Sequence, residues 1–293
     1  MSSSDGAVFG QMSRHFIELR NQYLNKYLTE GILYTDKSFD KFSTRDSNRS
    51  TKSVRWLRPH EICKQLHLPQ PVFIDNGMSI TDVSQGEISN CWFVAVIACL
   101  STLDNVLEKY VPPGQDFDQF YSGCFCFHIG CENNFTEVIV DDLLPVDENG
   151  NLIYGRNKQD RNEFWFPLFE KAYANHIGGY KNMVESRMSR GLEDLTKGVV
   201  NEISLYPSMT TDVFDDWKGL MNCGFLFLAY IESRDRSQWT KEEDLMNGLV
   251  RGHAYSITFM YSMDSDKSDR VLRLMQLKNP WGKKEWNGAW SDE

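Results

Sequence analysis

The sequence predicts an α+β protein built from two subdomains. Residues 16–28 and 163–176 carry apolar side chains at helical spacing, and the first half of 91–110 is apolar on nearly all sides, which is typical of a buried central helix. Strand-like segments dominate the second part of the chain, notably 225–231, 254–260 and 271–277. A helix-rich part followed by a strand-rich part indicates the α+β class.

We expect an N-terminal helical segment at 1–30, a first subdomain at 31–197 and a second subdomain at 198–293. The chain has 293 residues, enough for one large domain or two smaller ones that each bury a core. Gly31 marks the end of the first helix, because glycine is common just after a helix. The polar, aperiodic segment 43–58 predicts a solvated connector in preference to a basic docking patch.

The composition narrows the class of protein. The net charge of −10 argues against a nucleic-acid-binding protein, which normally carries a basic face. The longest apolar run, 92–100, has nine residues. Because a bilayer span takes about 20 residues, no transmembrane segment is expected. The start of the chain lacks the basic stretch and apolar core of a secretory signal, so we expect a cytoplasmic protein.

The cysteines predict free thiols. Their number, seven, is odd, and a reducing compartment favours thiols over disulfides. Cys124, Cys126 and Cys131 lie close together in the sequence, but no second pair of ligands follows at zinc spacing. We expect these three to be thiols of strands and loops.

One cysteine stands at a chemically useful place. Cys91 begins the most apolar helical segment of the chain. The N-terminus of a helix carries a partial positive charge that favours a thiolate, and cysteine proteolysis needs a thiolate, a base that creates it and a group that orients the base. A cysteine at the start of an apolar helix is, by itself, more often structural than catalytic.

A histidine and an asparagine supply the two other groups. His253 opens one predicted strand, and Asn279 follows the next. The polar residues 264–269 between these strands predict a turn, and the midpoint of positions 253 and 279 falls inside it. If the two strands pair antiparallel, His253 and Asn279 come close to each other, within the shift that a bulge allows.

Three neighbouring residues add to this pattern. Pro280 restrains Asn279 to an extended conformation, and Trp281 would shield a hydrogen bond between His253 and Asn279 from water. The side-chain amide of Gln85, six residues before the cysteine, would donate to the oxyanion of a tetrahedral intermediate beside the backbone amide of Cys91.

The motifs resemble those of calpains. Three segments of this chain resemble the active-site motifs of calpains: QGEISNCW (85–92), GHAYS (252–256) and NPWG (279–282). Three more resemble other calpain segments: VDDLLP (140–145), NEFW (162–165) and EKAY (170–173). The resemblance begins near Val72. It implies a papain-like core of two subdomains and a calcium-dependent cysteine endopeptidase that cleaves intracellular proteins. The roles it implies are nucleophile for Cys91, base for His253, orienting group for Asn279, oxyanion donor for Gln85 and substrate gate for Gly252 and Trp281.

The resemblance also implies two calcium sites. Oxygen-only ligation suits calcium. The first site would use the side chains of Asp82 and Glu163 and the backbone carbonyls of Asp75 and Gly77, and the second would use Glu285 and Asp292.

The sequence departs from the calpain pattern at several positions. Ser89-Asn90 replaces a usual Gly-Asp, Ser186 replaces a glycine of the substrate groove, and Ile80 replaces an arginine that links the calcium sites. The second subdomain is expected to be incomplete at its C-terminus, and a small regulatory subunit is not implied. The alternative is therefore a catalytically impaired, calpain-like scaffold or regulatory binding protein. A transglutaminase-like acyltransferase is disfavoured, because those enzymes orient their histidine with aspartate.

Overall fold

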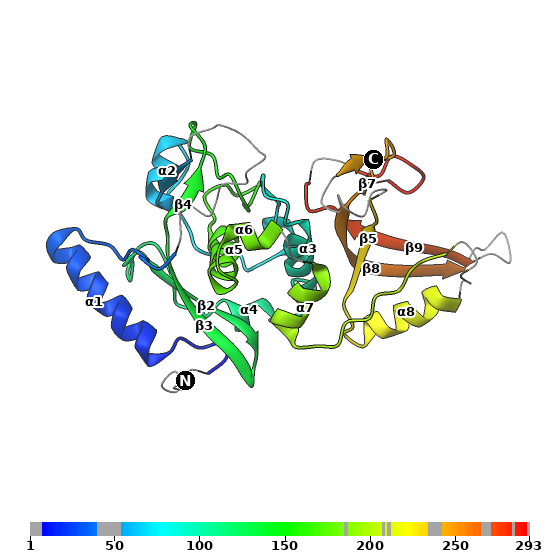
Figure 1. The fold of residues 1–293 in the computed structure, drawn as a ribbon, viewed down its shortest axis with the longest axis horizontal. Helices are drawn as coiled ribbons and strands as arrows, with labels where there is room; N and C mark the ends of the chain where they lie inside the picture. Colours follow the sequence, from blue (N-terminus) through cyan, green and yellow to red (C-terminus); the bar gives the residue numbers. More distant parts are fainter. Residues whose placement is uncertain are drawn as a thin grey trace.

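The computed structural model describes residues 8–39, 54–184, 187–206, 209, 212–233, 242–264, 271–282 and 285–291. The chain forms two lobes, and helices α3 and α7 lie where the lobes meet (Figure 1). The helices are α1 (Arg14–Glu30), α2 (Pro59–Gln65), the 3-10 helix η2 (Ile80–Asp82), α3 (Cys91–Leu100), α4 (Leu107–Tyr110), α5 (Trp165–His176), α6 (Tyr180–Val184), α7 (Met188–Thr196) and α8 (Asp212–Asn222).

The strands form small antiparallel sheets. In the first lobe β1 (Arg55–Leu57) pairs with β4 (Leu144–Val146), and β2 (Cys124–Cys131) pairs with β3 (Asn134–Asp141). The second lobe contains a three-stranded sheet in the order β5-β8-β9, with bounds Phe227–Ile231, His253–Asp264 and Val271–Lys278. Its other pair is β6 (Glu243–Asp244) with β7 (Val250–Arg251). The α+β prediction is confirmed.

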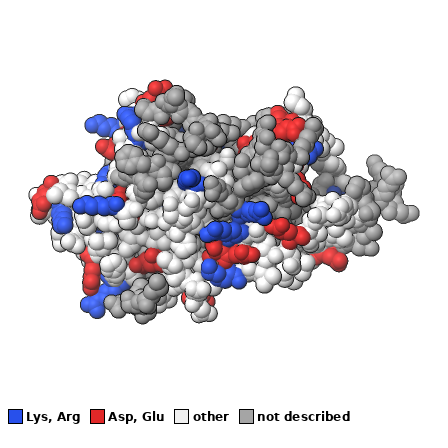
Figure 2. Space-filling view, in the orientation of Figure 1, with Lys and Arg blue, Asp and Glu red and all other residues white. Residues whose placement is uncertain are grey.

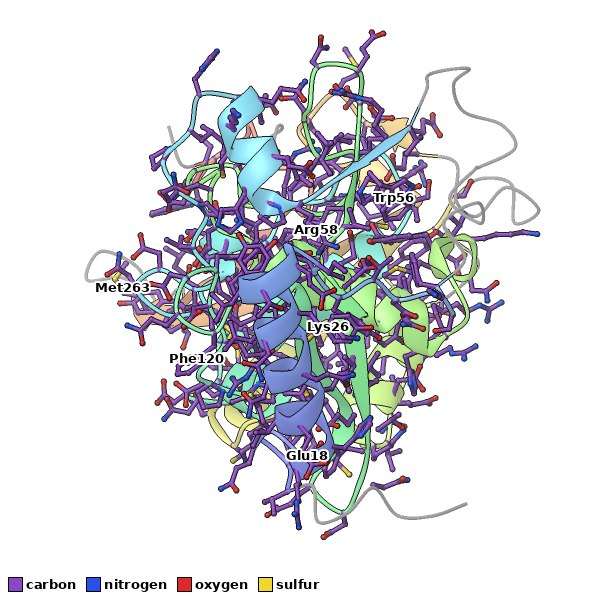
Figure 3. All side chains as sticks on the ribbon, turned by 90° about the vertical axis from the view of Figure 1, so that its left-hand side faces the viewer. Glu18, Lys26, Trp56, Arg58, Phe120 and Met263 are labelled. Carbon is purple, nitrogen blue, oxygen red and sulfur yellow. The ribbon has the colours of Figure 1, made fainter. Side chains whose placement is uncertain are left out.

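Helix α1 begins and ends where its sequence predicts. The Ser13 hydroxyl accepts a hydrogen bond from the Phe16 backbone N–H at 3.0 Å, and Gly31 ends the helix with a φ of 70°. Phe16 is wholly buried against Cys124 and Cys126 of the β2–β3 hairpin. The remaining side chains of α1 mostly face outward, as Glu18 and Lys26 illustrate in Figure 3. One buried aromatic residue therefore anchors this helix to the first lobe.

The central helix is shorter than predicted. Every residue of α3 is buried, but the helix ends at Leu100 instead of running to residue 110. The hydroxyls of Ser101 and Thr102 donate to the carbonyls of Ala98 and Cys99 at 2.8 and 2.7 Å. Such local side-chain bonds compete with the helical backbone pattern, and turns separate α3 from α4.

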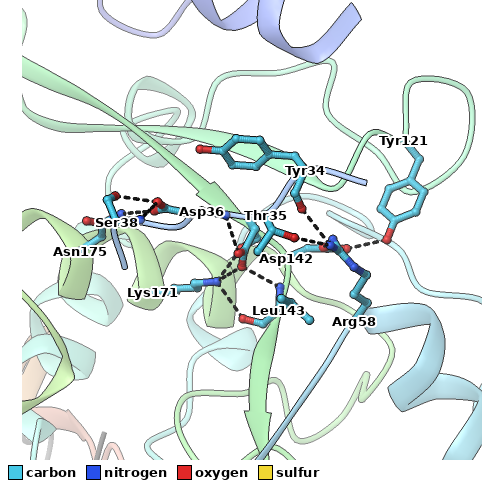
Figure 4. Close-up of polar contacts among 11 residues, drawn as sticks. Tyr34, Thr35, Asp36, Ser38, Arg58, Tyr121, Asp142, Leu143, Lys171 and Asn175 are labelled. Carbon is cyan, nitrogen blue, oxygen red and sulfur yellow. Dashed lines mark hydrogen bonds and ion pairs between the residues drawn. The ribbon is translucent and has the colours of Figure 1, made fainter. Parts of the chain in front are cut away.

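A buried polar network holds the first lobe together (Figure 4). Lys171 of α5 forms an ion pair with Asp141, and both side chains are fully buried. Asp141 also accepts a hydrogen bond from the Asp36 backbone N–H at 2.8 Å, and Lys171 donates to the carbonyl of Leu143 at 2.8 Å. The VDDLLP and EKAY motifs therefore meet in space and tie the segment after α1 to the core.

Asp142, the next residue of the VDDLLP motif, binds an arginine from the segment predicted to be a solvated connector. Asp142 is ion-paired with Arg58 and accepts a hydrogen bond from the Tyr121 hydroxyl at 2.7 Å. Burial raises the pKa of Asp142 to about 6, although Arg58 opposes the rise. Arg58 belongs to the segment predicted to be a solvated connector. That prediction is wrong for its last residues, because β1 and Arg58 are part of the fold, whereas residues 43–53 lie outside the described part of the chain.

The two lobes join at α3. The Ser256 hydroxyl of β8 donates to the Ala95 carbonyl of α3 at 2.8 Å, and both residues are buried. The Cys99 thiol donates to the Phe227 carbonyl of β5 at 3.5 Å. The helix that begins with Cys91 therefore packs directly against the sheet that carries His253.

The surface shows no separation of charge on the face drawn in Figure 2, where basic and acidic side chains lie interspersed among the coloured residues. Within the described ranges, each helix is too short or too polar to cross a bilayer.

Candidate active site

The predicted nucleophile lies at the first position of α3. Cys91 is 9% exposed, and its helix is preceded by Asn90. The Asn90 side chain donates to Glu170 of α5 at 2.7 Å, and both residues are buried. Burial raises the pKa of Glu170 to about 7, against the hydrogen bonds from Asn90 and Gly155. Asn90, predicted only as a departure from the calpain pattern, therefore fixes the start of the helix that presents the thiol.

The predicted base lies at the first position of β8. His253 pairs with Ile231 of β5 in the sheet, and its side chain is wholly buried. Gly252 precedes it with a φ of 65°, a left-handed conformation that favours glycine, and donates its backbone N–H to the Ile231 carbonyl. The sheet and this turn together fix the direction of the imidazole.

The predicted orienting amide contacts the imidazole. Asn279 Oδ1 lies 2.9 Å from His253 Nε2 and also accepts the Trp281 backbone N–H at 3.0 Å. Since Oδ1 is an acceptor, Nε2 carries hydrogen and Nδ1 faces away from Asn279. This arrangement selects the tautomer and the ring orientation.

The antiparallel pairing of β8 with β9 is confirmed, although the register differs from the predicted midpoint. After a bulge beside Ile257 the register pairs Ser256 with Lys278, so Asn279, the next residue, follows in line with Tyr255, two positions from His253. Residues two apart on a strand point to the same face. The amide therefore reaches the imidazole diagonally across the hairpin.

The nucleophile and the base meet at the junction of the lobes. The Cys91 sulfur lies within 4.8 Å of a ring nitrogen of His253. Burial lowers the pKa of His253, but hydrogen bonds with Cys91, Glu242 and Asn279 outweigh it and raise the pKa to about 9. A ring that holds its proton to that pH is suited to an ion pair with a thiolate.

The residue that sequence reasoning missed is Glu242. Its Oε1 lies 3.0 Å from His253 Nδ1, and its side chain is 15% exposed. In the sequence Glu242 is one of three consecutive acidic residues with no spacing that singles it out. Glu242 can be recognised only from the fold, which places this residue, just before β6, next to the start of β8.

The Trp281 indole lies against the imidazole. The two ring centroids are 4.8 Å apart, and Lys158 donates to the Trp281 carbonyl. A large aromatic ring at this distance excludes water from one side of His253. The predicted gating role of Trp281 and Gly252 remains a prediction.

The predicted oxyanion donor lies beside this loop. The Gln85 backbone N–H donates to the Pro280 carbonyl at 2.9 Å, so the loop before Cys91 is joined to the loop after Asn279. The Gln85 side-chain amide donates to the Ile88 carbonyl at 2.8 Å and is buried. This bond uses one of the two amide hydrogens, and the predicted role of Gln85 as an oxyanion donor remains a prediction.

The predicted ligands of the first calcium site lie together. Asn157 Nδ2 donates to both Glu163 Oε2 at 2.6 Å and Asp82 Oδ1 at 3.3 Å, so one amide bridges the two carboxylates. Glu163 Oε1 accepts the Asp75 backbone N–H at 2.7 Å. Gly77 lies in the same loop with a φ of 91°. An oxygen-only donor set with two adjacent carboxylates fits a calcium ion.

The second predicted site is described only in part. Glu285 is exposed. Its backbone carbonyl packs closely on Gly248, since a Cβ added to that glycine would lie only 1.9 Å from the carbonyl oxygen. Asp292 and the groove residue Ser186 lie outside the described residues. Burial lowers the pKa of Lys278, and the charges of Glu285 and Asp82 oppose that effect. Lys278 therefore lies near one predicted ligand of each calcium site. Ile80, at the position where calpains usually have an arginine, packs its apolar side chain against the core.

Comparison with known proteins identifies the family of the chain. The family model described as calpain family cysteine protease matches residues 33–293. Human calpain-12 is 40% identical over 274 residues, covering 90% of this chain and 36% of the relative. The Caenorhabditis elegans calpain clp-1 is 38% identical over 94% of this chain and 34% of its own length. The human calpain-1 catalytic subunit is 35% identical over 90% of this chain and 36% of its own length. The chain thus spans about a third of these relatives and belongs to the calpain family of cysteine proteases.

Proposed function

We propose that this chain is the core of a calcium-dependent cysteine endopeptidase that cleaves proteins at a limited number of sites. The observation that carries the proposal is the convergence of the Cys91 sulfur, the His253 imidazole and the Asn279 carbonyl oxygen from three separate elements. This geometry supplies a thiol, a base and an orienting group for the base.

Catalysis would begin with an ion pair between the Cys91 thiolate and the His253 imidazolium. The sulfur attacks the peptide carbonyl, and the backbone amide of Cys91 and the side chain of Gln85 stabilise the oxyanion. His253 Nδ1 donates its proton to the leaving amine, and an acyl-enzyme remains. His253 then takes a proton from water, which attacks the thioester and releases the acid. Asn279 holds Nε2 throughout.

Glu242 has to leave His253 Nδ1 during this cycle. The leaving amine must come within hydrogen-bond distance of Nδ1 to receive its proton. Glu242 Oε1 occupies a position 3.0 Å from that atom. The described arrangement is therefore a resting state, in which a carboxylate of the protein stands where the substrate's leaving group would be.

The test is hydrolysis of a fluorogenic peptide in the presence of calcium. Cys91→Ala should lose activity by several orders of magnitude, because no other group supplies the nucleophile. Cys223→Ala, which removes an exposed thiol, should retain it. Equal turnover by the parent chain and Cys91→Ala would refute the assignment.

Calcium dependence belongs to the same proposal. Asp82, Glu163 and the carbonyls of Asp75 and Gly77 would hold the ion, which would supply positive charge that binds the two carboxylates and stiffens their loops. Glu163→Gln should weaken calcium binding roughly tenfold or more, because ligand charge sets the affinity of such sites. Isothermal titration calorimetry measures the calcium affinity. Asp104→Asn, at an exposed aspartate, is the control. Unchanged affinity in Glu163→Gln would exclude this ligand set.

A second candidate is a calpain-like scaffold that binds partners without cleaving them. Glu242 beside Nδ1 favours it, because a carboxylate fixed there would block the leaving group. Labelling of Cys91 by a thiol-directed peptide inhibitor distinguishes the two candidates. No labelling in saturating calcium, with calcium still bound, supports the scaffold.

The cysteines support a cytoplasmic location. All seven are free thiols, and buried Cys91, Cys99, Cys124 and Cys126 are among them. Free thiols are the rule in reducing compartments.

A further inference from the structure

Three metal-binding side chains converge at the catalytic cysteine. The Cys91 sulfur, a ring nitrogen of His253 and a carboxylate oxygen of Glu242 all lie within 4.8 Å of one another. The His253 Nδ1 to Glu242 Oε1 distance is 3.0 Å. Ligands of a tetrahedral zinc ion lie roughly 3.3–3.7 Å apart, given bond lengths of about 2.0–2.3 Å. Side-chain adjustments of about 1 Å would place all three around one ion.

The imidazole is oriented as a metal ligand requires. Histidine ligands usually donate the hydrogen of their other ring nitrogen to a carbonyl or carboxylate oxygen, which fixes the tautomer. His253 Nε2 has that partner in Asn279 Oδ1, at 2.9 Å. The lone pair of Nδ1 therefore becomes available to a metal when its proton leaves.

The donor atoms select the kind of ion. A thiolate, an imidazole and a single carboxylate suit zinc and similar ions, whereas calcium takes six to eight oxygen ligands. Aromatic rings surround the site: Trp281 and Tyr255 lie 4.8 and 5.1 Å from the His253 ring, measured between centroids. Such a shell limits the access of water, which strengthens coordination.

A second cluster of similar composition does not have this geometry. Cys126, His128 and Glu137 lie close together in the β2–β3 hairpin. There the Gly10 backbone N–H donates to His128 Nδ1 at 3.0 Å, so the neutral ring carries its hydrogen on Nε2, the atom that faces Glu137. A metal bound at Nε2 would force the hydrogen onto Nδ1. Nδ1 faces the Gly10 N–H, a donor, so that tautomer would lack the acceptor that usually stabilises a histidine ligand.

We propose that Cys91, His253 and Glu242 form a zinc site in which zinc binds in place of the proton on His253 Nδ1. From the ion-pair state, binding releases that one proton to solvent, and a water molecule completes the tetrahedron. Zinc binding rests on the ligand geometry alone. Its consequence, inhibition of peptide hydrolysis, rests on the proposed function, because the bound ion occupies both the nucleophile and the base.

Cobalt(II) is the spectroscopic probe for this site. Titration of the calcium-free chain should produce a near-ultraviolet sulfur-to-cobalt charge-transfer band, which zinc abolishes by displacement. Cys91→Ser should lose the band. Glu242→Gln should weaken zinc binding by roughly 10–100-fold in a chelator-competition assay. Glu243→Gln, a change of the neighbouring exposed carboxylate, and Cys126→Ser, in the hairpin cluster, should bind zinc as tightly as the parent.

An experiment on the unaltered chain removes any dependence on the folding of variants. Zinc should slow alkylation of Cys91 by iodoacetamide at least tenfold, while exposed Cys223 reacts at the same rate with and without zinc, as peptide mass spectrometry would report. The proposal is overturned if Cys91 is alkylated equally fast with zinc, if Cys91→Ser keeps the charge-transfer band, or if Glu242→Gln binds zinc like the parent. None of these readouts requires turnover, so they are independent of the peptidase assay.

Discussion

At the scale of single residues, the His253 ring interacts with both a thiol and a carboxylate. Cys91 and Glu242 both face the ring, and each contributes a hydrogen bond that raises the pKa of His253 to about 9 against the effect of burial. The tyrosines of the adjoining strands, Tyr230 and Tyr255, face the same groups. The imidazolium is therefore the stable form of the ring at neutral pH.

The sign of the pH dependence follows from the raised pKa. The imidazolium persists up to about pH 9 and is lost as the pH rises through that value. Glu242→Gln removes one negative charge beside the ring, so the imidazolium should lose its proton at lower pH. We expect the basic limb of the pH profile of kcat/KM to move down by roughly one pH unit.

The control for this experiment is Glu243→Gln. Glu243 lies one position further along and contacts Arg251 at 3.8 Å, so its loss should leave the profile in place. A Glu242→Gln profile that coincides with that of the parent would show that Glu242 does not interact with the imidazole in the working enzyme.

At the scale of elements, the nucleophile helix is held by a close contact with α7. A Cβ at Gly191 would lie 2.7 Å from the Trp92 indole of α3. That ring cannot move freely, because its N–H donates to the Met183 carbonyl at 2.7 Å. The absence of a side chain at Gly191 therefore sets the distance between the two helices.

Gly191→Ala should destabilise the protein by about 1–3 kcal/mol, the usual cost of overpacking a core. The matched control is Gly219→Ala in α8, where a Cβ would meet nothing within 4 Å. There the better helix propensity of alanine should leave stability unchanged or raise it by up to about 1 kcal/mol. Urea unfolding measures both, and similar values for the two variants would contradict this account of the α3–α7 contact.

At the scale of the whole molecule, charges are buried where distant segments meet. Asp141, Lys171 and Asp142 are all fully buried, and they join β3, α5 and the segment after α1. Removing one partner of a buried ion pair leaves an uncompensated charge, which costs more than the pair itself contributes.

Lys171→Met should therefore lower the free energy of unfolding by about 3–5 kcal/mol. The double variant Asp141→Asn/Lys171→Met should recover part of that loss, because the unpaired carboxylate is then gone. Lys181→Met, at an exposed lysine, serves as the control. Equal stability of Lys171→Met and the parent in thermal unfolding would contradict the role assigned to this network.

Several elements of this fold could be predicted from local sequence patterns. Apolar periodicity and capping residues located α1 and α5, and the polar turn between two β-rich segments predicted the β8–β9 hairpin. Chemistry and spacing also indicated Cys91 at a helix start, His253 at a strand start and Asn279 after a strand, and the resemblance to calpain motifs implied their roles. The central helix was predicted too long, because apolar composition does not reveal that Ser101 and Thr102 bond back to the helix.

Which distant groups share one environment follows from the three-dimensional fold. Arg58 became a buried partner of Asp142, and Glu242 came within 3.0 Å of His253, although neither has a local sequence signal. The physical reason is that burial and electrostatics depend on distance in space. Local sequence patterns report only the few neighbours that a helix or strand brings together.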